Sequence, residues 1–195
     1  MDERYNGKRI SIRKDQMTSR TIIAGSGGQG IMLLGKVLAM AAMKENKFVT
    51  WLPSYGAEVR GGTAHCMLVI SDAEIGSPYI DKADTLIVMN APSLNKFRAR
   101  LEDKGLLIVN SSLAAAGAGG KAVILEYPFT DLAIKLGNIK VANMVALGSF
   151  ISRKKVVSPK SVEQVISDLA GESRKSLVEI NKKALEAGIR LRGKK

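Results

Sequence analysis

The chain has 195 residues, of which 46% are hydrophobic and 25% charged, close to the averages for soluble globular proteins. Its apolar runs are too short to span a bilayer and no signal-peptide core precedes them, so we expect neither a membrane protein nor an exported one. Cys66 is the only cysteine, which excludes an internal disulfide and favours a cytoplasmic protein.

The net charge of +12 is uneven along the chain. The excess of basic residues is +3 over residues 1–20, +2 over residues 21–152 and +7 over residues 153–195. A solvated basic surface explains this pattern, and so does a docking face for an acidic partner subunit, an electron carrier or a phosphate-bearing cofactor. A basic nucleic-acid-binding module is a further alternative, but aromatic residues make up only 5% and no base-stacking pattern accompanies the basic runs, so nucleic acid is not the favoured partner.

Residues 1–16 are polar and without period, which predicts a disordered extension before a single α/β domain over 17–195. In chain order, we expect a strand at 21–24, a helix at 31–43, strands at 47–52, 64–70 and 85–89, a helix at 91–101, strands at 105–110 and 122–127, and then mainly helices. One of these later helices begins at the cap Ser158 and Pro159. This alternation predicts a three-layer, Rossmann-like α/β sheet with helices on both faces and a helical C-terminal tail.

A glycine-rich turn joins the first expected strand to the first expected helix. Gly25, Gly27 and Gly30 match the G-x-G-x-x-G pattern of dinucleotide-binding turns, in which glycines let the backbone approach a phosphate. The acidic residue that would bind a ribose about 20 positions later is missing, since neither Glu45 nor Glu58 ends the second strand. A free-standing dinucleotide-dependent reductase therefore remains an alternative, and so does a turn whose glycines serve only tight packing.

The segment Pro53–Thr63 is the most distinctive loop of the sequence. It combines an aromatic ring, a carboxylate, a guanidinium and glycines, in the residues Tyr55, Glu58, Arg60, Gly61 and Gly62. Arg60 could bind a carboxylate or phosphate of a ligand through two hydrogen bonds. Alternatively, Glu58 could pair with Arg60 and hold the loop in place. We expect this loop and the glycine turn to meet at the carboxyl end of the sheet, where α/β folds bind ligands.

Three segments resemble one known family in order and spacing. Ile22–Gly30 is similar to the opening of the gamma subunits of 2-oxoacid:ferredoxin oxidoreductases, and Tyr55–Gly62 to their Y-G-x-E-x-R-G-G loop. Ala142–Gly148, which includes Asn143, resembles their N-x-x-x-L-G segment. The resemblance implies a subunit of an enzyme that decarboxylates a 2-oxoacid, with 2-oxoglutarate favoured, forms the acyl-coenzyme A ester and passes electrons to ferredoxin.

The resemblance also implies cofactors and partners. Thiamine diphosphate, iron–sulfur clusters and coenzyme A would serve the whole complex, in which alpha and beta subunits, with a delta subunit as a further candidate, accompany this chain. The chain itself has one cysteine and no thiamine-type G-D-G segment, so we expect it to be catalytically incomplete and to bind no metal or cofactor alone. The adjacent His65 and Cys66 should face opposite sides of a strand and pack there without forming a catalytic pair.

No catalytic residue is expected in this chain. The residues predicted to bind a cofactor or line an interface are Gly25, Gly27, Gly28, Gln29, Gly30, Tyr55, Glu58, Arg60, Gly61, Gly62 and Asn143.

Overall fold

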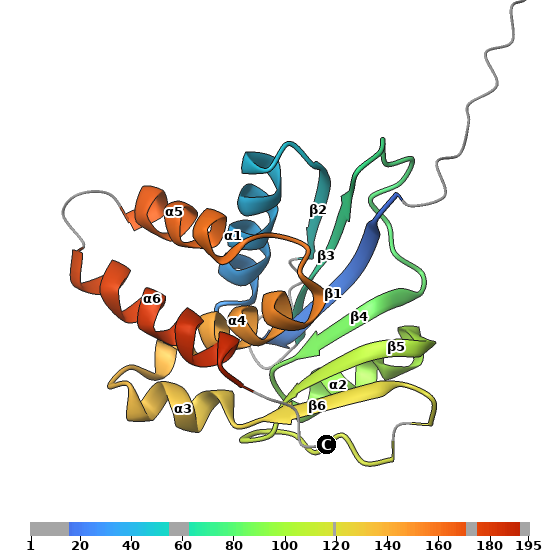
Figure 1. The fold of residues 1–195 in the computed structure, drawn as a ribbon. Coiled ribbons are helices and arrows are strands. Elements are labelled where there is room, and N and C mark those ends of the chain that lie inside the picture. The colour runs from blue at the N-terminus through green and yellow to red at the C-terminus, as the bar shows by residue number, and fades with distance from the viewer. Residues whose placement is uncertain (1–15, 55–62, 119, 171–174, 192–195) are drawn as a thin grey trace, which may run out of the picture.

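The computed structural model describes residues 16–54, 63–118, 120–170 and 175–191. In this part of the chain a six-stranded sheet has the order β2-β3-β1-β4-β5-β6 (Figure 1). The strands are β1 (Thr18–Ser26), β2 (Phe48–Ser54), β3 (Thr63–Ser71), β4 (Ala83–Val88), β5 (Leu101–Asn110) and β6 (Val123–Tyr127). The helices are α1 (Ile31–Lys44), α2 (Ala91–Phe97), α3 (Phe129–Lys135), α4 (Ala142–Lys154), α5 (Pro159–Ala170) and α6 (Lys175–Ile189).

The sheet is mixed. β1, β4, β5 and β6 run parallel to one another, as in half of a doubly wound fold. On the other side of β1 lies β3, which is antiparallel to β1 and to β2. β2 therefore runs in the same direction as β1 but is separated from it by one strand, so that the carboxyl ends of β1, β2, β4, β5 and β6 lie at one edge of the sheet.

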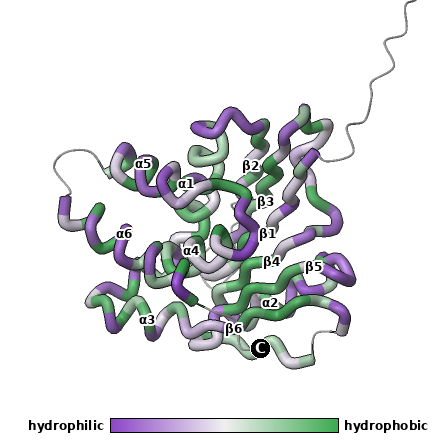
Figure 2. Tube along the Cα trace, viewed as in Figure 1, coloured by the Kyte–Doolittle hydropathy of each residue, from purple (hydrophilic) through white to green (hydrophobic). Residues whose placement is uncertain are grey.

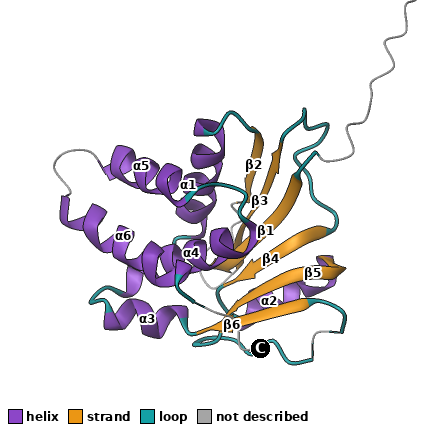
Figure 3. Cartoon of the chain, viewed as in Figure 1, coloured by secondary structure: helices purple, strands orange, loops and turns teal. Residues whose placement is uncertain are grey.

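Alternation along the central strands creates two hydrophobic layers. On β1, Ile23 faces the layer that contains α1 and α4, whereas Ile22 and Ala24 face the layer that contains α2. Figure 3 shows α1, α4, α5 and α6 together on one side of the strands. The expected α/β fold with helices on both faces is thus confirmed, with most of the helical mass on one face.

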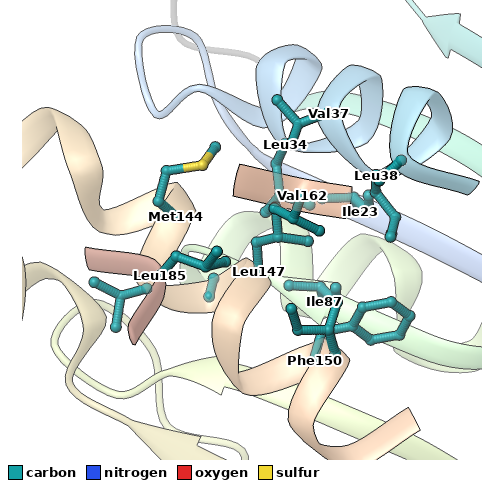
Figure 4. Packing of buried hydrophobic residues seen from close by; sticks show 14 of the residues in the cluster. Ile23, Leu34, Val37, Leu38, Ile87, Met144, Leu147, Phe150, Val162 and Leu185 are labelled. Carbon is teal, nitrogen blue, oxygen red and sulfur yellow. The ribbon is translucent and has the colours of Figure 1, made fainter. Parts of the chain in front are cut away.

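The larger layer joins the sheet to five helices, which are α1, α3, α4, α5 and α6. Figure 4 shows its side chains interdigitating, from β1 and β4 (Ile23, Ile87), α1 (Leu34, Val37, Leu38), α4 (Met144, Leu147, Phe150), α5 (Val162) and α6 (Leu185). In Figure 2 the central strands are mostly hydrophobic. The outer helices α5 and α6 alternate between hydrophobic and hydrophilic residues, as helices with one buried apolar stripe do.

The helices α4 and α6 pack backbone to backbone. A Cβ atom added to Gly148 of α4 would lie 2.1 Å from the carbonyl oxygen of Leu185, and one added to Gly188 of α6 would lie 2.0 Å from that of Val145. The absence of side chains at these two positions lets the C-terminal helix lie directly on α4.

The expected helix at 91–101 is too long. The structure ends α2 at Phe97, adds a 3-10 turn over Arg98–Arg100 and begins β5 at Leu101. Arg100 donates to the carbonyl oxygens of Asp81 and Ile80, which fastens the turn to the segment before β4 and directs the chain into the next strand. The predicted cap of α5 is confirmed, since the Ser158 hydroxyl accepts the Ser161 backbone N–H at 3.1 Å.

None of the helices in the described ranges combines the length and the apolar character that a membrane crossing requires.

Candidate functional site

The glycine turn lies at the carboxyl edge of the sheet, next to the strand ends that flank the second predicted loop. Ser26, at the end of β1, pairs with Thr63, at the start of β3, and Ser54, at the end of β2, pairs with His65. β2 thus ends, and β3 begins, beside the glycine turn. The predicted site residues of that loop lie outside the described residues, namely Tyr55, Glu58, Arg60, Gly61 and Gly62.

The glycine turn has the backbone that its sequence requires. Gly28 and Gly30 have φ angles of 87° and 70°, in the left-handed region that glycine enters without strain. Gly25 is buried, and a Cβ atom there would lie 2.6 Å from Gln29 Oε1. Gly27 and Gly28 are exposed at the tip of the turn. α1 then begins with no side-chain cap and no acidic residue in its first turn, so its N-terminal N–H groups keep their positive field.

Gln29 fastens the turn from inside. Its Oε1 accepts the backbone N–H of Ser26 at 2.7 Å, and its Nε2 donates to the carbonyl oxygen of Met89, after β4, at 3.3 Å. Both ends of the side chain are therefore used within the fold, and the turn is tied to the neighbouring strand.

Asn143 holds the turn from the opposite side. This residue is 1% exposed, lies in the first turn of α4, and donates from Nδ2 to the carbonyl oxygen of Gly30 at 3.1 Å. The two residues are so close that a Cβ atom on Gly30 would lie 2.3 Å from Nδ2 of Asn143. The structure thus brings Asn143 together with the glycine turn, although 113 residues separate them.

Two further asparagines line the carboxyl edge and were not predicted. Asn90 accepts the Ser93 N–H at 3.0 Å as the cap of α2, and its Nδ2 donates to the Ser26 hydroxyl. Asn110, at the end of β5, donates to the carbonyl oxygen of Met89 at 3.2 Å and to Thr130 Oγ1 at 2.9 Å. An asparagine directly before Ala-Pro is a helix-start signal that could have identified Asn90.

A small cavity of about 150 Å³ opens at this edge. Its walls are formed by Gly28, Gln29, Met89, Leu113, Thr130, Ile139, Lys140 and Ala142. The lining is mainly apolar and carries one ammonium group and one hydroxyl group. This arrangement can hold an apolar group with a hydrogen-bond acceptor beside it.

His65 and Cys66 point to opposite faces of β3, as expected. The His65 ring packs against Phe97 with their centroids 4.7 Å apart, whereas Cys66 is buried in the layer below α1. Burial, and then Lys96 and Arg100, lower the pKa of His65, and burial raises the pKa of the Cys66 thiol to about 11. A buried and protonated thiol on its own does not fit an iron–sulfur cluster, which needs several thiolates.

Metal ligands are not gathered in the described part of the chain, which holds no group of three or more His, Cys, Asp or Glu side chains able to bind an ion.

Comparisons with known proteins identify the family of this chain. The family model described as pyruvate ferredoxin/flavodoxin oxidoreductase matches residues 20–191. The ketoisovalerate oxidoreductase subunit VorA of Methanothermobacter thermautotrophicus is 36% identical over 171 residues, which are 87% of this chain and 35% of that protein. The chain thus spans about a third of the length of this relative.

Separate subunits of similar length also match. The 2-oxoglutarate synthase subunit KorC of Archaeoglobus fulgidus is 35% identical over 170 residues, which are 87% of this chain and 85% of that one. The crystal structure of the keto/oxoacid ferredoxin oxidoreductase gamma subunit from Geobacter sulfurreducens has 30% identity and a TM-score of 0.75, and the match covers 87% of this chain and 95% of that one. The chain therefore belongs to the pyruvate ferredoxin/flavodoxin oxidoreductase family, and its length and fold are those of the family's separate gamma subunits.

Proposed function

We propose that this chain is the gamma subunit of a 2-oxoacid:ferredoxin oxidoreductase that forms acyl-coenzyme A from a 2-oxoacid and passes the electrons to ferredoxin. The observation that carries the proposal is the match to a separate gamma subunit along 95% of that chain, with the same fold. We favour 2-oxoglutarate as the substrate because, among relatives that align along most of their own length, the KorC subunit is 35% identical, whereas a pyruvate/ketoisovalerate common gamma subunit is 28% identical.

The residues of this chain support placing the redox chemistry in partner subunits. Its only cysteine, Cys66, is fully buried, so iron–sulfur clusters would be bound elsewhere, and no thiamine-type segment occurs in the sequence. The proposed partners are alpha and beta subunits, with a delta subunit as a further candidate, and they would supply thiamine diphosphate and the clusters. This chain would contribute shape, contacts and part of a binding surface.

The carboxyl edge is the part of the chain that we expect to face the partner subunits or the phosphates of coenzyme A. The exposed tip of the glycine turn, Gly27 and Gly28, leads into the uncapped start of α1, whose field favours an anion. Lys140 adds a positive charge at the same edge. In the second loop, Arg60 is the residue that we propose for a charge contact.

Native co-purification tests the proposed function. The tagged full-length chain, expressed together with the reading frames that neighbour its own, should purify with larger subunits that carry thiamine diphosphate and iron. A panel of 2-oxoglutarate, pyruvate and branched-chain 2-oxoacids, assayed by ferredoxin reduction with coenzyme A, should give the highest kcat/KM for 2-oxoglutarate. A complex without thiamine diphosphate would contradict the proposal.

Replacing Arg60 tests the charge contact. We expect Arg60→Ala to weaken coenzyme A affinity, subunit assembly or turnover by about 10- to 100-fold, because a lost charge-assisted hydrogen bond costs about 1.5–3 kcal/mol. Arg190→Ala is the control, since that side chain is 79% exposed on α6. If all three quantities stayed unchanged in Arg60→Ala, Arg60 would have no functional role.

A further inference from the structure

Two asparagine side chains at the carboxyl edge have an orientation that the backbone determines. Oδ1 of Asn110 accepts the Thr130 N–H at 3.3 Å, and its Nδ2 donates to the carbonyl oxygen of Met89 at 3.2 Å. Since a backbone N–H can only donate and a carbonyl oxygen can only accept, these bonds identify which end of the amide is the oxygen. In Asn90 the oxygen is identified in the same way by the Ser93 N–H, at 3.0 Å.

Each of these amides also donates to a hydroxyl group. Asn110 Nδ2 lies 2.9 Å from Thr130 Oγ1, and Asn90 Nδ2 donates to Ser26 Oγ. An amide nitrogen is a donor only, so both hydroxyl oxygens are the acceptors in these bonds. Each hydroxyl therefore keeps its own proton for a further bond, and within the described residues neither proton has an acceptor.

Both hydroxyls lie beside the glycine turn, at the edge where we propose the contact with coenzyme A. Ser26 is the last residue of β1 and directly precedes the turn. Thr130, in the first turn of α3, lines the small cavity that Gly28 and Lys140 also line. Both hydroxyl residues are half-buried. Two outward donors and an ammonium group suit a ligand group that offers only acceptors, as a phosphate does.

We propose that Asn90 and Asn110 are positioning residues for coenzyme A, because they keep the hydroxyls of Ser26 and Thr130 turned outward as donors to its phosphates. The proposal rests on the proposed function and adds the residues that set the hydrogen-bond polarity of that site. Both asparagines are buried and their amide atoms are bonded within the fold, so they act on a ligand only through the hydroxyls.

Replacing these asparagines by aspartate tests the proposal, because the shape of the side chain is retained while the bond to the hydroxyl is reversed. In Asn110→Asp the new carboxylate accepts the hydroxyl proton of Thr130, which is then lost to the ligand. Asn90→Asp reverses the bond to Ser26 in the same way. This variant should fold, because aspartate caps a helix as well as asparagine does, and its thermal melt verifies this.

The measurement is the dissociation constant of coenzyme A, obtained by calorimetric titration of the co-purified complex, together with kcat and the KM of the 2-oxoacid. We expect both aspartate variants, and Thr130→Val and Ser26→Ala, to raise this constant at least about tenfold, because each removes a hydrogen bond to a charged group. We expect kcat and the KM of the 2-oxoacid to change by less than about twofold.

Two further variants serve as controls. Thr130→Ser retains the hydroxyl and should bind coenzyme A within about twofold of wild type. Asn181→Asp makes the same chemical change on α6, where the amide donates to the carbonyl oxygen of Leu177 and to no hydroxyl within the described residues. It should likewise bind coenzyme A as the wild type does.

Double variants separate positioning from a plain effect of charge. A carboxylate repels a phosphate in any background, whereas reversal of the hydrogen bond requires the hydroxyl. We therefore expect Asn110→Asp to weaken coenzyme A binding at least about fivefold less in the Thr130→Val background than in the wild type. Asn90→Asp in the Ser26→Ala background is an independent second cycle, which decides the question if Asn110→Asp does not fold.

Failure of this proposal and failure of the proposed function give different results. A wild-type complex without coenzyme A-dependent ferredoxin reduction contradicts the proposed function. If the wild-type complex is active and removal of the two hydroxyls leaves coenzyme A binding unchanged, the hydroxyls are not ligands and only this proposal is wrong. It is also wrong if the aspartate changes act equally with and without the hydroxyls, or if the KM of the 2-oxoacid rises in place of the coenzyme A dissociation constant.

Discussion

The glycine turn is held by side chains whose polar atoms are directed into the fold. Gln29 bonds to Ser26 and Met89, and Asn143 bonds to Gly30. Residue types that suggest ligand contacts in the sequence thus shape the backbone in the structure. The part of the turn that remains open to a partner is the exposed tip at Gly27 and Gly28.

Two glycines of this turn should respond differently to alanine. Both need a positive φ, which costs alanine about 1–2 kcal/mol. At Gly28 nothing lies within 4 Å of the added Cβ atom, whereas at Gly30 it meets Asn143. We therefore expect Gly30→Ala to lower the unfolding free energy by at least about 1 kcal/mol more than Gly28→Ala does, in urea titrations.

The double variant Gly30→Ala/Asn143→Ala isolates the collision. It should be more stable than the sum of the two single changes predicts, by about 0.5–3 kcal/mol, because the colliding side chain is gone. Strict additivity would show that the strain comes from φ alone.

Burial of Cys66 predicts a dependence of stability on pH. Burial raises the pKa of its thiol from the ordinary 9.0 to about 11, with the nearby Trp51 acting in the opposite direction. The folded chain therefore keeps a proton that the unfolded chain releases, and this contribution is complete below pH 9 and lost as the pH rises through 11. The stability difference between wild type and Cys66→Ala should fall by about 2–3 kcal/mol over this range in chemical denaturation. The same difference at every pH would contradict this account.

At the scale of elements, local patterns could predict where strands and helices lie, but not how they pair. The apolar run before Gly25 predicts β1, and Ser158-Pro159 predicts the start of α5. The expected helix at 91–101 is longer than α2 because Arg100 fastens the turn after α2 to the segment before β4, and a local pattern does not contain such contacts.

The close contact between α4 and α6 predicts that replacing its glycines by alanine lowers the stability of the chain. Helix propensity alone would make Gly148→Ala and Gly188→Ala stabilising by about 1 kcal/mol. Both new Cβ atoms, however, would meet the backbone of the facing helix, so the helices must separate. We expect each change to destabilise the chain by about 2–3 kcal/mol in thermal and urea unfolding. Gly76→Ala, which has open space around it, is the control and should be nearly neutral.

At the scale of the whole molecule, the antiparallel β3 separates this fold from a dinucleotide-binding one. In a Rossmann fold, the acid that binds the ribose ends the parallel strand next to β1. Here that neighbour is β3, whose carboxyl end lies at the opposite edge of the sheet. This explains why the glycine pattern occurs without its acidic residue, a reason that the sequence could not supply because strand order depends on contacts between distant residues.

The purified chain should therefore show no specific NADH or NADPH binding. A ligand present at one hundred times its Kd stabilises a protein by about 2.7 kcal/mol, which raises the Tm of a chain of this size by several degrees. We expect millimolar NADH and NADPH to shift the Tm by less than about 1 °C in differential scanning fluorimetry. A dose-dependent increase would support the alternative of a free-standing reductase.

The candidate site could be predicted only in part, because several of its contacts join residues that are distant in the sequence. The spacing of Gly25, Gly27 and Gly30 is local and could be found, and the segment around Asn143 could be found by its resemblance to the family. That Asn143 bonds to Gly30 could not be predicted, because the two residues are 113 positions apart in the sequence. Asn110 carries no local signal, since its partners Met89 and Thr130 lie on other elements.

The two kinds of glycine contact have different consequences for the evolution of this chain. At Gly30 the obstacle to a larger residue is a side chain, so a smaller residue at position 143 relieves the collision, and the two positions can vary together. At Gly148 and Gly188 the obstacle is the backbone of the facing helix, which no substitution elsewhere can remove. Among homologues that keep α6 on α4, covariation should therefore connect positions 30 and 143, whereas positions 148 and 188 should each stay glycine.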